Sequence, residues 1–314
     1  MQDTKQSGCI SRRKALKVLG AAGAAGALAQ PAMAAEKAGA WDPVAEFFQT
    51  HFREMTPEEK QETVARFERK YSKQFGKDVT VSAKDAIPGV KFVYMLDIGR
   101  CIGCRRCVYG CVKENNQSRP SDHSSQIQYI RVVKHEGVDP LDFDDVEHYY
   151  EEELVPQRPG TYVPVQCQQC DKPPCVQACP VQATWKDKGD GVVQIDYNWC
   201  IGCRFCMAAC PYQARRFNWG KPNLPAEEMN PVTHYLGNRP RMKGVVEKCH
   251  FCMQRTREGL YPACHEVCPT GVRKFGNILD PNSEVSQVMK RYKVFRLKED
   301  LGTEPSFFYY SSTK

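Results

Sequence analysis

The sequence lacks the signatures of several common protein classes. No apolar run reaches the 18 residues of a membrane-spanning helix, so we expect the mature chain not to span a bilayer by itself. It has no glycine-rich phosphate loop and no nucleophile–base arrangement, which argues against a nucleotide-dependent enzyme or a hydrolase. The haem attachment pattern Cys-x-x-Cys-His is also missing, because Met253 follows Cys252. The apolar fraction of 41% is adequate for a folded core but not rich.

Cysteine, by contrast, is abundant, with 17 residues in the chain. The run from Cys200 to Pro211 follows C-x2-C-x2-C-x3-C-P, the spacing with which bacterial ferredoxins hold [4Fe–4S] clusters. Three variants of this run recur, and only Cys9 lies outside them. In chain order, motif I is Cys101, Cys104, Cys107 and Cys111; motif II is Cys167, Cys170, Cys175 and Cys179; motif III is Cys200, Cys203, Cys206 and Cys210; and motif IV is Cys249, Cys252, Cys264 and Cys268.

The four motifs are of two kinds. Residues 94–105 match residues 193–204 in a strand-like stretch, an aspartate and a Cys-Ile-Gly-Cys-Arg run, so motifs I and III are one type. Motifs II and IV share a widened middle gap and end in Cys-Pro. An internal repeat of this kind indicates two copies of a two-motif unit. We therefore expect an α+β fold with two ferredoxin-like domains of two [4Fe–4S] clusters each, a helical N-terminal extension and loop insertions.

The way the motifs pair decides the domains. The 20 residues between Cys179 and Cys200 form a short predicted hairpin, with a turn at 189–191 and a strand at 192–195. Motif II is therefore expected to fold with motif III, which leaves motif I with motif IV. Pairing I with II and III with IV also satisfies the repeat. The preferred division is 91–111 with 245–279 for I/IV, 164–217 for II/III, an acidic insert at 112–163, a linker at 218–244 and a C-terminal tail at 280–314.

The same pairing predicts the ligands of each cluster. In two-cluster ferredoxins the fourth cysteine of a motif ligates the cluster of the other motif. Four sites with four cysteines each follow. Site A is Cys101, Cys104, Cys107 and Cys268; site B is Cys111, Cys249, Cys252 and Cys264; site C is Cys167, Cys170, Cys175 and Cys210; and site D is Cys179, Cys200, Cys203 and Cys206.

Two other uses of these cysteines have to be weighed. Four structural zinc ions could take sixteen cysteines, and a disulfide framework would suit an exported protein. The C-x2-C-x2-C-x3-C-P spacing is much more specific than paired C-x2-C, however, and cysteines three apart in one loop make poor disulfide partners. The net charge of +7 does not indicate nucleic-acid binding, because residues 1–34 carry +4 and four cubanes of about −2 each bring the rest to roughly −5.

The N-terminus has the features of an export signal. Residues 11–17 resemble the twin-arginine motif, with Ala15 where that motif prefers Phe. A weakly apolar run of 12 residues follows at 18–29, and Ala32-Met33-Ala34 forms an A-x-A cleavage site. We expect a signal peptide over 1–34 and a protein on the outer, periplasmic face of the cytoplasmic membrane. The alternative is a cytoplasmic amphipathic or disordered tail.

Residues 35–90 form the predicted helical extension. One helix is expected over 43–53, and a second begins at the capping box Thr56–Glu59, with Pro57 in its first turn, and stops at Gly76. Its apolar face consists of Val64, Phe67, Tyr71 and Phe75. This extension packs on its own domain or docks a partner subunit. The acidic run at 142–153 is either a solvated loop or a docking patch for a basic redox protein such as a c-type cytochrome.

Further elements and side chains complete these expectations. We expect strands at 91–98, 127–133, 294–297 and 307–310, and a helix at 283–291. The residues expected around the motifs are His250 and His265 beside ligands, Trp185, Trp199 and Trp219 as packing that excludes water, and Arg105, Arg106 and Arg204 as counter-charges or surface residues.

Over residues 91–279 these motifs resemble the four-cluster iron–sulfur subunits of dimethyl-sulfoxide, polysulfide and formate-dependent nitrite reductase systems and related menaquinone-linked complexes. The resemblance implies a non-catalytic subunit that relays electrons between an integral-membrane quinone-binding subunit and either a molybdopterin catalytic subunit or a multihaem c-type cytochrome. Membrane association would be through the partner only, with no role for nucleic acid. The alternative is a stand-alone reductase of a small oxyanion or sulfur compound at an exposed cluster, which full cysteine ligation of all four sites argues against.

Overall fold

The computed structural model describes most of the chain after residue 53. The described residues are 47, 54–122, 126–135 and 160–313. They mix short helices with small sheets, as the α+β expectation requires. The predicted signal peptide, the predicted helix at 43–53 apart from residue 47, and the acidic run at 142–153 lie outside the described residues and stay predictions.

The largest sheet brings motifs I and IV together. Strand β2 (Phe92–Asp97) pairs antiparallel with β10 (Arg273–Asn277) and parallel with β12 (Phe307–Tyr310), and β11 (Val294–Phe295) adds to the free edge of β12. Motif I begins shortly after β2 ends, and β10 begins shortly after motif IV ends. Because the end of β2 pairs with the start of β10, both motifs lie at the same end of this sheet.

The segment predicted as a C-terminal tail, 280–314, contributes strands β11 and β12 to this sheet. Helix α9 (Glu284–Arg291) begins at its cap Ser283 and packs Val285 and Val288 against strands β2 and β12. Strand β12 coincides with the predicted strand at 307–310, and all four of its residues are buried. The strand predicted at 294–297 is shorter, ending at Phe295.

Motifs II and III are joined by the predicted hairpin. Strands β5 (Thr184–Lys186) and β6 (Val193–Ile195) pair antiparallel between them. One-turn helices α5 (Pro174–Gln177) and α6 (Phe205–Ala208) pack on each other beside this hairpin. In the other unit, α4 (Arg106–Glu114) packs on α8 (Ala263–Glu266) in the same way, while α7 (Met253–Thr256) lies inside the widened gap of motif IV.

Two small sheets connect the unit of motifs I and IV with the unit of motifs II and III. Strand β7 (Arg216–Phe217), after motif III, pairs with β9 (Val246–Glu247), before motif IV. Strand β3 (Arg131–His135) pairs with β4 (Thr161–Val165), which leads into motif II. The strand predicted at 127–133 therefore starts late. The physical reason is that the residues just before β3 bond to the segment after α4 instead, with Ile127 N donating to Ser118 O at 3.1 Å.

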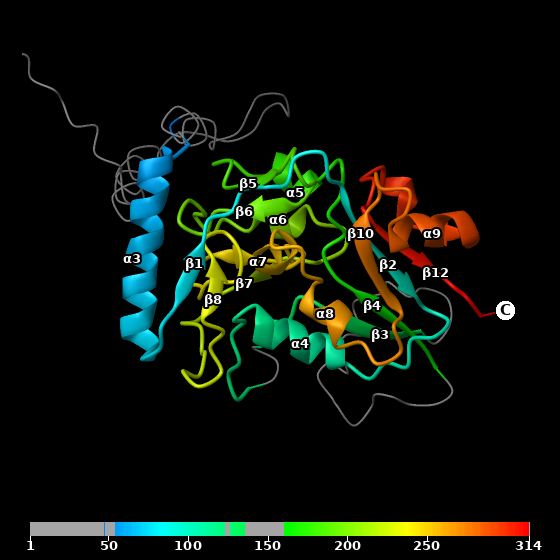
Figure 1. The fold of residues 1–314 in the computed structure, drawn as a ribbon, viewed down its shortest axis with the longest axis horizontal. Helices are drawn as coiled ribbons and strands as arrows, with labels where there is room; N and C mark the ends of the chain where they lie inside the picture. Colours follow the sequence, from blue (N-terminus) through cyan, green and yellow to red (C-terminus); the bar gives the residue numbers. More distant parts are fainter. Residues whose placement is uncertain (1–46, 48–53, 123–125, 136–159, 314) are drawn as a thin grey trace, which may run out of the picture.

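The N-terminal helix packs on its own chain. Helix α3 (Pro57–Phe75) has the predicted capping box and ends at the left-handed Gly76. Its buried Phe67 and Tyr71 pack against residues after the helix and against Met229. Strand β1 (Thr80–Ser82) pairs parallel with β8 (Val232–His234), and Figure 1 shows α3 and β1 at one edge of the molecule, opposite α9. This contact supports the expectation that the extension belongs to its own domain.

The predicted linker at 218–244 is folded into the molecule. It contains β8, and His234, Asn238 and Arg239 within it are fully buried. Two asparagines of this segment serve as donors: Asn230 Nδ2 and Asn238 Nδ2 each donate to the Glu114 carbonyl at 3.0 Å. Both bonds stabilise the last carbonyl of α4, which an isolated helix would leave without a partner.

Candidate iron–sulfur sites

The sixteen motif cysteines are free thiols in the structure. The four cysteines of site A line one cavity, together with Gly103, Arg105 and Arg273. The four cysteines of site D line a second cavity, together with Gly202, Arg204 and Arg215. Each of these two groups combines three cysteines of one motif with one cysteine from another, as the I/IV and II/III pairing predicts.

Sites B and C lie deeper in the protein. Burial raises the pKa of Cys111, and the nearby thiols of Cys252, Cys264 and Cys249 raise it further. At site C, burial raises the pKa of Cys170 to about 12, with Cys167, Cys175 and Cys210 contributing. Thiols whose neighbours are other thiols deprotonate reluctantly, because each new thiolate repels the next. Such a group can lose its protons together only when it gains cationic compensation.

The four sites form a row in the order A, B, C, D. Helix α4 carries Cys107 of site A and Cys111 of site B. Cys175 of site C and Cys179 of site D are likewise four residues apart. Sites B and C adjoin across the two units, since Gln169, next to Cys170 of site C, donates through Nε2 to the carbonyl of Cys249 of site B at 2.8 Å.

A buried lysine stands where sites B and C adjoin. Lys248 donates through Nζ to the Cys249 carbonyl at 2.7 Å and to the Val193 carbonyl. Burial lowers the pKa of Lys248, and the thiols of Cys167 and Cys249 oppose that shift. Lys248 therefore joins the two units at the point where sites B and C adjoin.

Glycine shapes the loops that carry the first cysteines of motifs I and III. Gly103 and Gly202 have φ values of +68° and +77°, a conformation that side chains disfavour. A Cβ atom on Gly103 would meet the Tyr162 ring at 2.7 Å, and one on Gly202 would overlap the Gly244 carbonyl oxygen. The Cys-Ile-Gly-Cys run therefore allows the loop to turn tightly while its thiols converge.

An incompletely bonded arginine indicates what sites C and D can hold. Arg215 is 2% exposed and donates through Nη2 to Cys175 Sγ at 3.1 Å and to Thr184 Oγ1 at 3.0 Å. Among the described residues its Nε and Nη1 have no partner, although both are buried. A buried cation in this state requires anionic acceptors. An iron–sulfur cube with four thiolates is an anion of that kind, so the residues present fit such a group.

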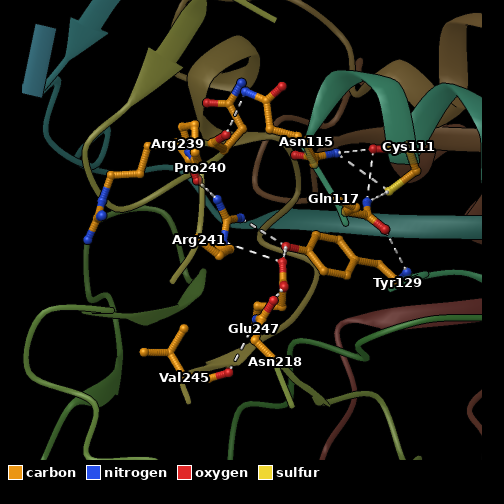
Figure 2. A network of polar contacts seen from close by, with 12 residues as sticks. Cys111, Asn115, Gln117, Tyr129, Asn218, Arg239, Pro240, Arg241, Val245 and Glu247 are labelled. Atoms are coloured by element: carbon orange, nitrogen blue, oxygen red, sulfur yellow. Dashed lines mark hydrogen bonds and ion pairs between the residues drawn. The ribbon is translucent and has the colours of Figure 1, made fainter. Parts of the chain in front are cut away.

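Site B has several neutral hydrogen-bond donors around its sulfur atoms. The Tyr94 hydroxyl lies 3.2 Å from Cys264 Sγ. Gln117 Nε2 donates to Cys111 Sγ at 3.2 Å, and Asn115 Nδ2 lies 3.5 Å from the same sulfur (Figure 2). Donors to cluster sulfurs raise the reduction potential. These side chains were missed in the sequence, where the only signal is that two of them directly follow motif I.

A buried polar network fixes one of these donors (Figure 2). Gln117 Oε1 accepts from the Tyr129 backbone N–H at 3.2 Å, and the Tyr129 hydroxyl donates to Glu247 at 2.6 Å. Arg241 completes the network, donating to the Tyr129 hydroxyl at 2.9 Å and lying 3.4 Å from Glu247. Because buried charges are stable only when paired, this network holds Gln117 in one orientation beside site B.

The residues expected around the motifs have varied environments. His250 is buried and accepts from Met253 N through Nδ1, and burial lowers its pKa, so its ring is neutral. His265 stacks on Tyr261, away from the core. Trp199 donates to the Val181 carbonyl at 2.6 Å.

Trp219 corrects the expectation that all three tryptophans exclude water. It is 65% exposed and lies beneath Arg204, whose guanidinium carbon is 4.5 Å from its ring centroid. The other two tryptophans pack against the buried clusters of the core. Trp219 follows the short strand β7, at whose end the chain turns to the surface.

An α+β chain with four convergent groups of four cysteines defines the class of multi-cluster, ferredoxin-type proteins. Two family models, both described as "4Fe-4S dicluster domain", match residues 159–230 with 232–278 and residues 100–183. Within the described residues, no helix is both long and apolar enough to cross a membrane.

Curated relatives agree with this class. The chain is 41% identical to a putative iron–sulfur subunit of dimethyl sulfoxide reductase from Halobacterium salinarum, over 68% of this chain and 77% of the relative. It is 36% identical to the "Menaquinone reductase, iron-sulfur cluster-binding subunit" of Nitratidesulfovibrio vulgaris, over 71% and 89%. It is 32% identical to "Protein NrfC" of Escherichia coli, over 71% and 81%. The chain therefore belongs to the family of iron–sulfur subunits with 4Fe-4S dicluster domains.

Proposed function

We propose that this chain is a non-catalytic electron-transfer subunit that holds four [4Fe–4S] clusters, one each at sites A, B, C and D. The observation that carries the proposal is the row of four cysteine groups. All four cysteines of site B and three of the four at site C are buried, whereas three cysteines of site A and two of site D are half-buried. A cluster of this type, when bound, takes up and releases one electron. The row therefore connects two ends of the protein that lie near its surface.

The protein residues have a positioning role in this function. The thiols hold the clusters, the neutral donors around site B and the arginines near sites A, C and D set their charge environment, and the core excludes water from the inner sites. A zinc ion with four thiolates would be an anion as well, so Arg215 does not separate it from a cluster; the ferredoxin spacing and the matching 4Fe-4S dicluster models favour clusters. The disulfide alternative finds no support among the sixteen cysteines, which are free in the structure.

The relatives' names support a place in a respiratory complex. They include subunits of dimethyl sulfoxide, selenate and tetrathionate reductases and of menaquinone-linked enzymes. For this chain we propose an integral-membrane quinone-binding partner and, on the other side, a molybdopterin catalytic subunit or a multihaem c-type cytochrome. Membrane association is then through the partner.

The proposed location is the outer face of the cytoplasmic membrane. It rests on the twin arginines Arg12 and Arg13, the short apolar run and the A-x-A site ending at Ala34. The N-terminal sequence of the protein purified from its native host tests this, and we expect it to begin at Ala35. An N-terminus that still contains the first 34 residues, in a protein found only in the cytoplasm, would contradict the proposal.

Reductive titration of the isolated, cluster-loaded chain tests the function. We expect an uptake of about four electrons per chain, because each cluster accepts one. Oxyanions or sulfur compounds such as tetrathionate should not be reduced catalytically by this chain alone. Substantial turnover that depends on such a substrate would favour the stand-alone reductase and would contradict the relay.

A further inference from the structure

Two buried arginines lie between the paired sites of the two units. Arg273 is 1% exposed and donates through Nη2 to Cys107 Sγ of site A at 3.3 Å. Its guanidinium carbon also lies 5.5 Å from the ring centroid of Tyr94, whose hydroxyl is 3.2 Å from Cys264 Sγ of site B. The Gln166 side chain fixes it from behind, accepting from Nη1 at 3.0 Å.

Arg215 has the corresponding place in the other unit. Its contact with Cys175 belongs to site C, while its side chain also lines the cavity formed by the cysteines of site D. Its electrostatic neighbours include Cys206 of site D as well as Cys175 and Cys167 of site C. Two of its nitrogens lack partners within the part of the chain that the structure describes, so part of this guanidinium is available to an anionic group.

The two arginines occupy equivalent positions in the internal repeat, one in each unit. Each stands five residues after the cysteine of a Cys-Pro pair, Cys210 for Arg215 and Cys268 for Arg273. The third Cys-Pro pair has Thr184 at this position, and Thr184 accepts a hydrogen bond from Arg215. In the II/III unit, therefore, the neutral Thr184 stands at the position equivalent to that of Arg215 and is its hydrogen-bond partner.

A charged guanidinium between two clusters affects the reduction of both, which a neutral hydrogen-bond donor does not. Both guanidinium groups are charged, because an arginine side chain is not deprotonated in proteins. Each reduction adds one negative charge, and two reduced neighbours repel each other strongly at low dielectric. A fixed cation between them favours the reduced form of both.

We propose that Arg273 is the shared counter-ion of the clusters at sites A and B, and Arg215 that of the clusters at sites C and D. Each guanidinium keeps both clusters of its unit reducible together. This inference rests on the proposed function, since it requires clusters at the four sites.

The test is a redox titration of the full, cluster-loaded chain followed by electron paramagnetic resonance (EPR). Arg215→Gln and Arg273→Gln remove the charge and keep a hydrogen-bond donor. Arg215→Lys and Arg273→Lys keep the charge and lose the planar fork. Iron and sulfide counts on the same samples report whether the clusters are present, so a failure of cluster binding is distinguished from a failure of this inference.

We expect each Gln variant to lower the ratio of reduced to oxidised cluster at a fixed potential at least tenfold, equal to 59 mV for one electron. The change should affect both clusters of the same unit and leave the other unit within threefold. Each Lys variant should stay within threefold throughout. Changes below threefold in the Gln variants, or equal changes in both units, would overturn the proposal. If a Gln variant fails to load clusters, a tenfold change in its Lys variant would overturn it, and a ratio within threefold of wild type would support it.

Discussion

Sites B and C have the same ligand pattern but different surroundings. Four residues after Cys111 stands Asn115, whose side chain contacts the sulfur; four residues after Cys210 stands Ala214, which offers only its backbone N–H at 3.5 Å. The repeat likewise matches Tyr94, whose hydroxyl contacts Cys264, with Val193 in the other unit.

The remaining donors differ in kind as well as in number. Site C has the guanidinium of Arg215 and a hydroxyl, that of Thr303, which opposes the rise in the pKa of Cys170. Site B has amide and phenol groups. The duplication thus supplies equivalent ligands, and residues outside the motifs make the two inner sites electrically different.

The largest expected effect comes from removing a shared cysteine. Cys210→Ala should abolish the cluster of site C, because its fourth ligand is gone, and leave the cluster held by Cys200, Cys203 and Cys206 in place. Cys111→Ala is the matched change for site B. Iron analysis and EPR measure the losses. Disappearance of the site D signal with an intact site C signal in Cys210→Ala would refute the pairing.

Substitution of the loop glycines, Gly103 at site A and Gly202 at site D, should distinguish the two outer loops by the stability that each loses. Gly202→Ala is expected to destabilise the protein by more than about 1 kcal/mol, since it forces a side chain to positive φ and against a backbone carbonyl. Gly103→Ala should cost less, because the opposing Tyr162 ring can shift. Thermal unfolding of the cluster-loaded variants measures both. A larger loss in Gly103→Ala would contradict this reading of the two contacts.

Gln117→Leu tests the donors around site B. Loss of a hydrogen bond to a charged sulfur should lower the reduced-to-oxidised ratio of the site B cluster about tenfold, or about 1.4 kcal/mol, and leave site C unchanged. Gln126→Leu is the control, because this glutamine bonds to the Pro120 carbonyl. An equal shift in both variants would show that the effect is not local.

Tyr94→Phe should have the smallest effect and should make site B more like site C. It removes one hydroxyl near Cys264 and keeps the stacking on Phe307, whose ring centroid lies 5.0 Å away. The expected decrease in the reduced-to-oxidised ratio of the site B cluster is a few-fold, about 0.5–1.5 kcal/mol. An increase in that ratio, measured by EPR titration, would contradict a donor role for this hydroxyl.

The sequence predicted the elements that depend on local spacing. The capping box of α3, the hairpin between motifs II and III, α9 and β12 all follow from short patterns, and the structure confirms them. The sequence did not show where the segments at 218–244 and 280–314 pack, because their place depends on long-range pairing of β8 with β1 and of β12 with β2.

The surroundings of the sites were predicted less well than the cysteine groups. Arg105, Arg106 and Arg204 attracted attention because they lie inside motifs, but Arg215 and Arg273 donate to the sulfurs. Asn115 and Gln117 likewise reach site B only because the chain after α4 turns back over it. No short spacing specifies such contacts, because tertiary packing determines them.

The central claim is that the sixteen cysteines hold four [4Fe–4S] clusters. Metal and acid-labile sulfide analysis of the full chain, purified without oxygen, tests it most directly. The account predicts about 16 iron and about 16 sulfide per chain, since each cube contains four of each. About four zinc ions per chain, without iron or sulfide, would contradict it.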